Sequence, residues 1–343
     1  MEPWNQTVAA AKLSWSLSNC TVDTSYRFTF YQVSYSIIFL LGLVTNGLAL
    51  HRLCRSRCTF NSTFVTYMVS LTVADLCFVL SLPLRIFFYY KKAQALSSPG
   101  DQSTWTTGVV YCHLTFILKY ISLYGGIFFL VGIAVDRYFA VVHPLAPMLR
   151  RLRAAQLVSA AIWCLVLGLS VGLPLLRSAA AHGQHPCLLD PSSLQDRTVI
   201  VAALAVVQAS FVVPTLLLLY CYCRVLSVLR QPRHHQRSRL RSRRHTLTLI
   251  YWVLGVFLFC FLPYHVNLLG YTLTHVGVLT HCGLTKVTRA AHPVVLSLAS
   301  SNCCLNPLVY FFSSSLAQRE APGTGCGSGT GTGGGGGVGS TSR

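Results

Sequence analysis

The segment "CHLTFILKYISLYGGIFFLVGIAVDRYFAVVHP", from Cys112 to Pro144, carries charged residues at both ends of an apolar stretch. Lys119 lies near its beginning, and Asp136 and Arg137 lie near its end. At about 1.5 Å per residue, the helix from Lys119 to Arg137 is about 27 Å long, close to the roughly 30 Å of a hydrocarbon core. The two charged sites therefore belong to opposite faces of a membrane. A charge within a membrane-spanning segment indicates function.

The composition indicates one polytopic membrane domain. Of the 343 residues, 53% are hydrophobic and 10% are charged, against about 25% charged in soluble proteins. Apolar runs of about 20 residues, the length of a membrane-spanning helix, recur along the chain. We predict an all-α membrane protein with a seven-transmembrane helix bundle. The predicted spans are Tyr31–Leu53, Val65–Tyr89, Val109–Val142, Ala154–Leu176, Thr198–Leu229, Thr246–Leu273 and Thr288–Phe312.

The net charge of +19 reflects topology rather than nucleic-acid binding. Arginines cluster after the first, third and fifth spans, which marks these loops as cytoplasmic. The N-terminus is then extracellular, so residues 1–30 form an extracellular segment, residues 31–312 the seven-transmembrane bundle and residues 313–343 a cytoplasmic tail. The Gly/Ser/Thr-rich tail has the composition of a disordered segment. We expect membrane lipids and no nucleic acid among the partners.

Covalent modification is expected on the extracellular side. The sequons at Asn5 and Asn19 predict glycosylation there. Four cysteines also fall on this oxidising side, which favours two disulfides and leaves three pairings open: Cys20, Cys112, Cys187 and Cys282. In the tail, Cys326 is a candidate for palmitoylation. No Cys/His spacing typical of a metal site occurs.

The outer halves of the spans carry cations without acidic partners. Arg85 lies about 15 Å outward of Asp75 along its helix, Lys119 lies at a related depth, and Arg177 ends the fourth span. Buried charges need partners, so we predict a cationic pocket for an anionic ligand. Arginine suits bidentate phosphate contacts and lysine supplies a point charge. The alternative is that the arginines extend to headgroups or water.

Aromatic and polar side chains accompany these two sites. Residues that combine an apolar body with a polar tip are predicted to line the pocket, with ordinary helix packing as the alternative: Tyr120, Tyr124, Tyr264 and His265. Deeper in the bundle, Asp75 has amide neighbours that can hydrogen-bond around it: Asn46, Asn302 and Asn306. A buried carboxyl in such company suggests a sodium ion or water; we expect no other cofactor.

The ordered markers of the spans resemble those of the rhodopsin-like G-protein-coupled receptors over Tyr31 to Phe312. They are "GLVTNGLAL", "LTVADL", Cys112 with "DRY", Trp163, Pro214 with Tyr222, "FLFCFLPYH" and "NPLVY". This resemblance implies a multi-pass plasma-membrane receptor that activates a heterotrimeric G protein. It also implies the disulfides Cys112–Cys187 and Cys20–Cys282.

The same resemblance assigns roles at the inner face. It implies that Asp136 restrains Arg137 until Arg137 turns toward the G protein, and a set of residues at this end supports the switch: Asp136, Arg137, Tyr138, Tyr222, Asn306, Pro307 and Tyr310. Pro263 predicts a kink in the sixth span, and Phe261 is the candidate relay beside it. Phe261 replaces the usual Trp of the family, and Gly126 replaces a Ser that helps to hold sodium.

Three further segments indicate a subgroup within this receptor family. "LSLPLRIFFYY", "FILKYISLYGGIFFLV" and "LPLLRS" look most like receptors for lysophosphatidylserine and neighbouring lysophospholipid or nucleotide receptors. The expected ligand is therefore an anionic lysophospholipid, with a nucleotide as the alternative. The segment after Phe312 lacks the pattern of the family's amphipathic eighth helix.

Other classes fit less well. A transporter would be expected to show internal repeats, which the chain lacks, and an opsin needs a lysine inside the last span, where Ser300 stands. No nucleophile–base set, metal site or phosphate loop indicates an enzyme. A decoy receptor is disfavoured by the intact "DRY" and "NPLVY" motifs.

Overall fold

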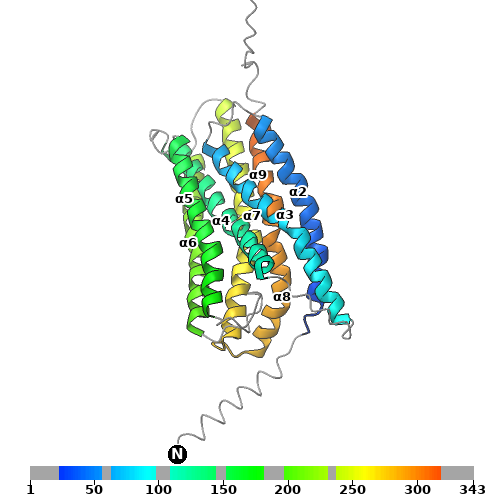
Figure 1. The fold of residues 1–343 in the computed structure, drawn as a ribbon. Helices are drawn as coiled ribbons and strands as arrows, with labels where there is room; N and C mark the ends of the chain where they lie inside the picture. Colours follow the sequence, from blue (N-terminus) through cyan, green and yellow to red (C-terminus); the bar gives the residue numbers. More distant parts are fainter. Residues whose placement is uncertain are drawn as a thin grey trace, which may run out of the picture.

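The computed structural model describes residues 23–55, 63–97, 109–143, 152–180, 197–230 and 237–317. All of its regular structure is helical, and no strand occurs within these ranges. The helices lie side by side in one elongated bundle (Figure 1). Their bounds are α2 Tyr26–Arg55, α3 Thr63–Ser97, α4 Val109–Val142, α5 Leu152–Ala180, α6 Arg197–Arg230, α7 Arg237–His275, α8 Cys282–Ser300 and α9 Asn302–Ala317.

Six of these helices, α2 to α7, are long and apolar enough to cross a membrane. They correspond to the first six predicted spans. Helix α4 is the central one, because 67% of its apolar window is buried inside the protein, against 22% for α5 and α6. It packs against α3, α5, α6 and α7 and also reaches α8 and α9. The charged residues of the "KYISL" and "DRY" segments are therefore carried on the helix with the most neighbours.

The seventh span differs from the prediction, because it is divided in two. We expected a continuous helix over Thr288–Phe312, but α8 ends at Ser300 and α9 begins at Asn302. Ser300 Oγ donates to the Leu296 carbonyl at 2.8 Å, and Ser301 Oγ donates to the Leu298 carbonyl at 2.7 Å. Such back-bonding competes with the helical ladder and bends helices. Helix α9 continues to Ala317, beyond the predicted end.

One family marker explains how the bundle tolerates Pro307 inside α9. A proline has no N–H for the carbonyl four residues earlier, which here belongs to Cys303. Asn46 of α2 donates its Nδ2 to that carbonyl at 2.7 Å and to the Gly42 carbonyl at 2.9 Å. A buried carbonyl without a partner is costly, so Asn46 replaces the bond that Pro307 removes.

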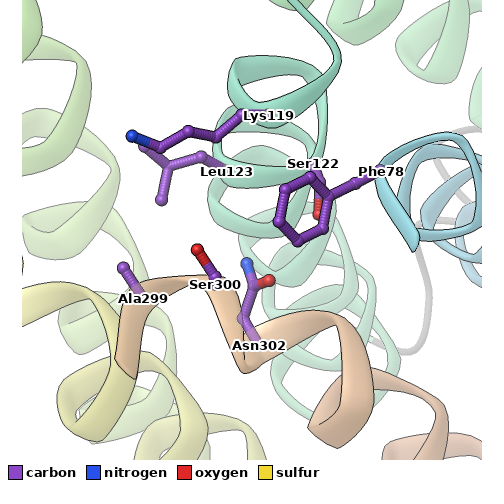
Figure 2. A pocket seen from close by; sticks show the side chains of 7 residues that line it. All are labelled: Phe78, Lys119, Ser122, Leu123, Ala299, Ser300 and Asn302. Atoms are coloured by element: carbon purple, nitrogen blue, oxygen red, sulfur yellow. The ribbon is translucent and has the colours of Figure 1, made fainter. Parts of the chain in front are cut away.

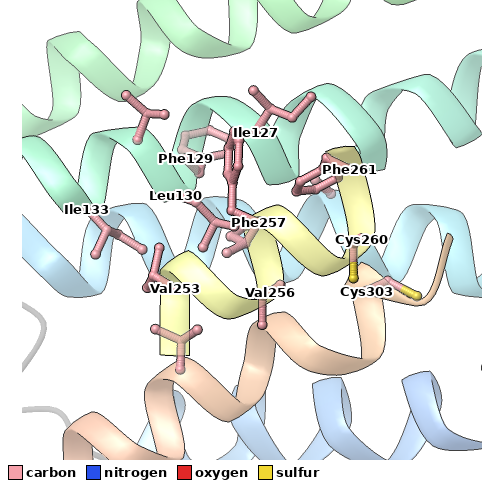
Figure 3. Packing of buried hydrophobic residues seen from close by; sticks show 14 of the residues in the cluster. Ile127, Phe129, Leu130, Ile133, Val253, Val256, Phe257, Cys260, Phe261 and Cys303 are labelled. Atoms are coloured by element: carbon pink, nitrogen blue, oxygen red, sulfur yellow. The ribbon is translucent and has the colours of Figure 1, made fainter. Parts of the chain in front are cut away.

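The core joins α4 to α7 and α9 (Figure 3). Buried apolar residues on α7 contribute to this core: Val253, Val256, Phe257, Cys260 and Phe261. In Figure 3, Phe257 and Phe261 point toward α4, whereas Val256 and Cys260 point toward α9. Phe257 and Phe261 meet edge to face with ring centroids 5.3 Å apart. Phe261 is completely buried. This packing fixes α7 against α4 between the outer and inner charged sites.

Candidate functional site

Lys119 stands on α4 and reaches into the bundle above Ser300 and Asn302 (Figure 2). Its Nζ lies 5.1 Å from the ring centroid of Tyr120 and 5.8 Å from that of Tyr264. Both distances are within the range of cation–π attraction. No carboxylate pairs with Lys119 within the described ranges, where the one ion pair joins Arg137 to Asp136. The aromatic rings thus hold the ammonium without neutralising it.

Arg85 of α3 is the second cation of the outer site. It is 7% exposed, and its Nε and Nη2 atoms have no hydrogen-bond partner. The guanidinium carbon lies 5.8 Å from the Phe78 ring centroid. Arg85 and Lys119 are near enough to repel each other electrostatically. Like charges that are not neutralised in a low-dielectric bundle are costly unless an anion joins them.

The predicted aromatic residues divide into two groups. Tyr120 and Tyr264 contact Lys119, as described above. Tyr124 and His265 are buried and take part in helix packing: Tyr124 stacks on Phe128 with centroids 6.4 Å apart, and His265 stacks on Phe211 of α6 at 4.0 Å. The Nδ1 atom of His265 also lies 2.9 Å from the Phe261 carbonyl. Both residues pack against neighbouring rings, but Tyr124 Oη and His265 Nε2 are buried without a hydrogen-bond partner, so their place in the ligand pocket stays a prediction.

The outer site also contains residues that we did not predict. Tyr35 of α2 is fully buried and interacts electrostatically with Arg85, and it stacks on Tyr31 with centroids 5.4 Å apart. His292 of α8 is close enough to Lys119 to interact electrostatically and stacks on Tyr271 at 4.9 Å. The i, i+4 spacing of Tyr31 and Tyr35 was an available signal.

Several predicted residues lie outside the described part. Arg177 and Cys112 belong to α5 and α4, but their side chains are not among those described, and the same holds for Tyr310 in α9. Outside the described residues altogether lie Asn5, Asn19, Cys20, Cys187 and Cys326. Cys282 is disulfide-bonded; its pairing with Cys20 stays a prediction.

The inner site lies at the far end of α4. Arg137 Nη2 is 2.8 Å from Asp136 Oδ2, and Thr63 of α3 donates to Asp136 Oδ1 at 2.5 Å. The Arg137 guanidinium carbon lies 5.2 Å from the Phe64 ring centroid, and Tyr222 is close enough to interact with Arg137 electrostatically. Asp136 thus holds Arg137 on α4, with Thr63 holding Asp136 in turn.

Tyr138 points to a different set of partners from those of its two neighbours in the motif. Its hydroxyl lies 3.1 Å from His143 Nε2, and its ring centroid lies 6.0 Å from that of Tyr220 on α6. Tyr138 therefore joins the inner ends of α4 and α6 and does not contribute to the Arg137–Asp136 pair.

The surroundings of Asp75 differ from the prediction. Asn306 Nδ2 donates to Asp75 Oδ2 at 2.9 Å, as expected. The other oxygen accepts a bond of 2.8 Å from Ser122 of α4, which we had not predicted. The expectation for Asn46 was wrong, because it bonds main-chain carbonyls. Asn302 Nδ2 is buried without a partner.

Comparisons with known proteins identify the class. Residues 45–310 match the family described as 7 transmembrane receptor (rhodopsin family), and the chain belongs to this family. It is a multi-pass receptor of the plasma membrane, and the predicted family and fold are confirmed. The family is one of receptors and not of enzymes.

Individual relatives indicate which subgroup of the family this chain is similar to. Lysophosphatidic acid receptor 6 of Mus musculus is 32% identical over 306 residues, covering 88% of this chain and 85% of the relative. A protein of Homo sapiens named as a putative purinoceptor is 32% identical over 299 residues, with coverages of 86% and 84%. Probable G-protein coupled receptor 174 of Homo sapiens is 32% identical over 304 residues, with coverages of 87% and 86%. The predicted lysophospholipid and nucleotide branch is confirmed.

Proposed function

We propose that this chain is a cell-surface receptor that binds an anionic extracellular lysophospholipid and activates heterotrimeric G proteins. The observation that carries the proposal is the pair of cations in the outer bundle, Arg85 and Lys119, which have no carboxylate partner among the described residues. The ligand would be released unchanged, since receptor action needs only that binding favour one conformation over another.

Arg85 supports a phosphate or carboxylate contact. Two of its nitrogens, Nε and Nη2, are buried and unpartnered. These two atoms form one edge of the guanidinium fork, which matches a pair of anion oxygens. An unpaired buried donor costs about 1–3 kcal/mol and more when charged. Ligand oxygens on this edge would remove that cost, and Lys119 would add the charge of a flexible ammonium nearby.

A lysophospholipid is favoured over a nucleotide by the relatives. Relatives at 31–33% identity carry the name lysophosphatidic acid receptor 6, whereas the purinoceptor among them is named putative. Arg85 and Lys119 suit the phosphate of either ligand, so the cations do not separate the two. A nucleotide is therefore the alternative that the experiment must address.

The inner site supports the signalling half of the proposal. The Arg137–Asp136 pair at 2.8 Å is partly exposed, with side-chain exposures of 26% and 7%. Arg137 is the more exposed partner, so a G-protein group could reach its guanidinium, while Asp136 is nearly buried and bonded to Thr63. Tyr222 and Asn306 are the residues that would support the rearranged Arg137 and α9.

The test is a ligand panel on cells that express the full chain. Lysophosphatidic acid, lysophosphatidylserine and the common nucleotides are applied, and dissociation of each G-protein class is recorded. We expect a saturable response to a lysophospholipid that is absent from cells without the chain. A response to nucleotides alone would replace the lipid proposal, and an anion flux without G-protein dissociation would replace the receptor mechanism by transport.

A further inference from the structure

A small cavity lies inward of the Lys119 ammonium, where α8 gives way to α9 (Figure 2). Counted as the space open to the centre of a water-sized sphere, its volume is about 10 Å³. Its polar walls are Ser122, Ser300 and Asn302, and the Lys119 side chain, Phe78 and Leu123 supply other parts of the wall. A volume of about 10–15 Å³ on this measure is what one water molecule needs.

The three polar residues of the wall differ in which hydrogen bonds they have left to make. Asn302 is 1% exposed, and its Nδ2 has two N–H groups and no partner. Ser122 Oγ donates to Asp75 at 2.8 Å, and Ser300 Oγ donates to the Leu296 carbonyl at 2.8 Å. Each hydroxyl has thus used its single proton and keeps acceptor lone pairs. The cavity offers one donor group and two acceptors.

We propose that this cavity is the binding site of one ordered water molecule, which accepts a hydrogen bond from Asn302 and donates one each to Ser122 and Ser300. Three bonds is the usual number for a buried water. The water satisfies the buried amide of Asn302, whose unpartnered state would cost about 1–3 kcal/mol.

The same atoms do not fit a sodium ion, although the family resemblance and the buried carboxylate of Asp75 suggest one. A hard cation requires oxygen ligands, whereas Asn302 presents N–H groups. The hydroxyl expected at position 126 is replaced by a glycine, and a Cβ there would lie 2.6 Å from Asn302 Nδ2 and 2.9 Å from Phe261 Cζ. The space of the missing ligand is therefore filled by protein.

The buried polar atoms without partners also favour water over a sodium ion. Asn302 supplies a donor, Nδ2, and Asn306 supplies an acceptor, Oδ1, and both are buried. The proposed water serves the donor of Asn302, which a cation cannot do; Asn306 does not line the cavity, and both protons of this water are donated to Ser122 and Ser300. The water site connects Ser122, one helical turn inward of Lys119, with Asn302 at the start of α9. It does not depend on which ligand binds outside.

A sodium titration tests the choice of water over sodium. The thermal unfolding midpoint of the purified full chain is measured in sodium chloride and in choline chloride at equal ionic strength. A ligand that binds the folded state raises the midpoint as its concentration rises. We expect no difference between the two salts. A sodium-dependent rise that disappears in Asp75→Asn would overturn the proposal.

A structure of the ligand-free full chain, determined at a resolution that shows water, tests the site itself. We expect one density peak within hydrogen-bonding distance of Asn302 Nδ2 and the hydroxyls of Ser122 and Ser300. A cavity without density, or a peak in contact with oxygens only, contradicts the water site. Neither experiment uses a ligand, so their failure would leave the roles proposed for Arg85 and Lys119 intact.

Discussion

Replacement of Gly126 by alanine tests the packing at the centre of the bundle. The new Cβ would lie 2.6 Å from Asn302 Nδ2 and 2.9 Å from Phe261 Cζ, and both distances are shorter than van der Waals contact. Overpacking of a core costs about 1–3 kcal/mol. Alanine also favours the helix by up to about 1 kcal/mol over glycine, so the strain must be measured against a matched glycine.

Gly168 on α5 provides that match, because a Cβ there meets nothing within 4 Å. Gly168→Ala therefore changes the free energy of unfolding only through helix propensity. The free energies of unfolding of the two variants should differ by the overpacking strain at position 126, about 1–3 kcal/mol. At about 2–4 °C per kcal/mol for a chain of this order of size, the difference in unfolding midpoint is about 2–12 °C. Thermal unfolding of the purified variants in the same detergent measures it. Equal midpoints would refute the contact of Gly126 with Phe261 and Asn302.

Three further predictions concern other parts of the chain. Arg137→Ala should leave agonist affinity unchanged and weaken nucleotide exchange on purified G protein; undiminished exchange contradicts the proposed switch. Thr63→Val removes the bond that holds Asp136, so agonist-independent exchange should rise by a factor of about 2–5, as expected for the loss of about 0.5–1 kcal/mol, and unchanged basal exchange would refute this lock. Cys282→Ser should lower the unfolding midpoint, because Cys282 is disulfide-bonded and a lost disulfide costs about 2–5 kcal/mol; a midpoint equal to that of the parent chain would show that the bond does not stabilise the fold.

Sequence reasoning predicted those features that depend on one helix at a time. The distance between Lys119 and Arg137 follows from the rise per residue, and both residues lie on one continuous helix, α4. The order of the spans and the position of Pro307 likewise follow from local patterns. These predictions succeeded because the membrane imposes length and hydrophobicity on each span separately.

Features that depend on contacts between helices were missed. The break at Ser301 was also missed, although the hydroxyl back-bonding that accompanies it is local to one segment. Between helices, Asn46 bonds the Cys303 carbonyl because Pro307 leaves it free. Ser122 bonds Asp75 only because α3 and α4 bring them together. Tyr35 was overlooked because its neighbour Arg85 comes from another helix. Such pairs cannot be found from the spacing within a single segment.

The central claim is that Arg85 binds an anionic group of the ligand, and paired substitutions test it most directly. Concentration–response curves for lysophosphatidic acid and lysophosphatidylserine are recorded with the parent chain, Arg85→Gln and Arg85→Lys. The control is Lys91→Gln, which removes an exposed cation from the outer end of the same helix. Cell-surface expression is matched among the variants.

A charge-assisted hydrogen bond contributes about 1.5–3 kcal/mol, so Arg85→Gln should raise the half-maximal concentration about 10- to 150-fold. Arg85→Lys keeps the charge but loses the bidentate edge and should give an intermediate shift, while Lys91→Gln should leave the curve in place. If Arg85→Gln responds to the same lipid with the half-maximal concentration of the parent chain, Arg85 does not bind the ligand.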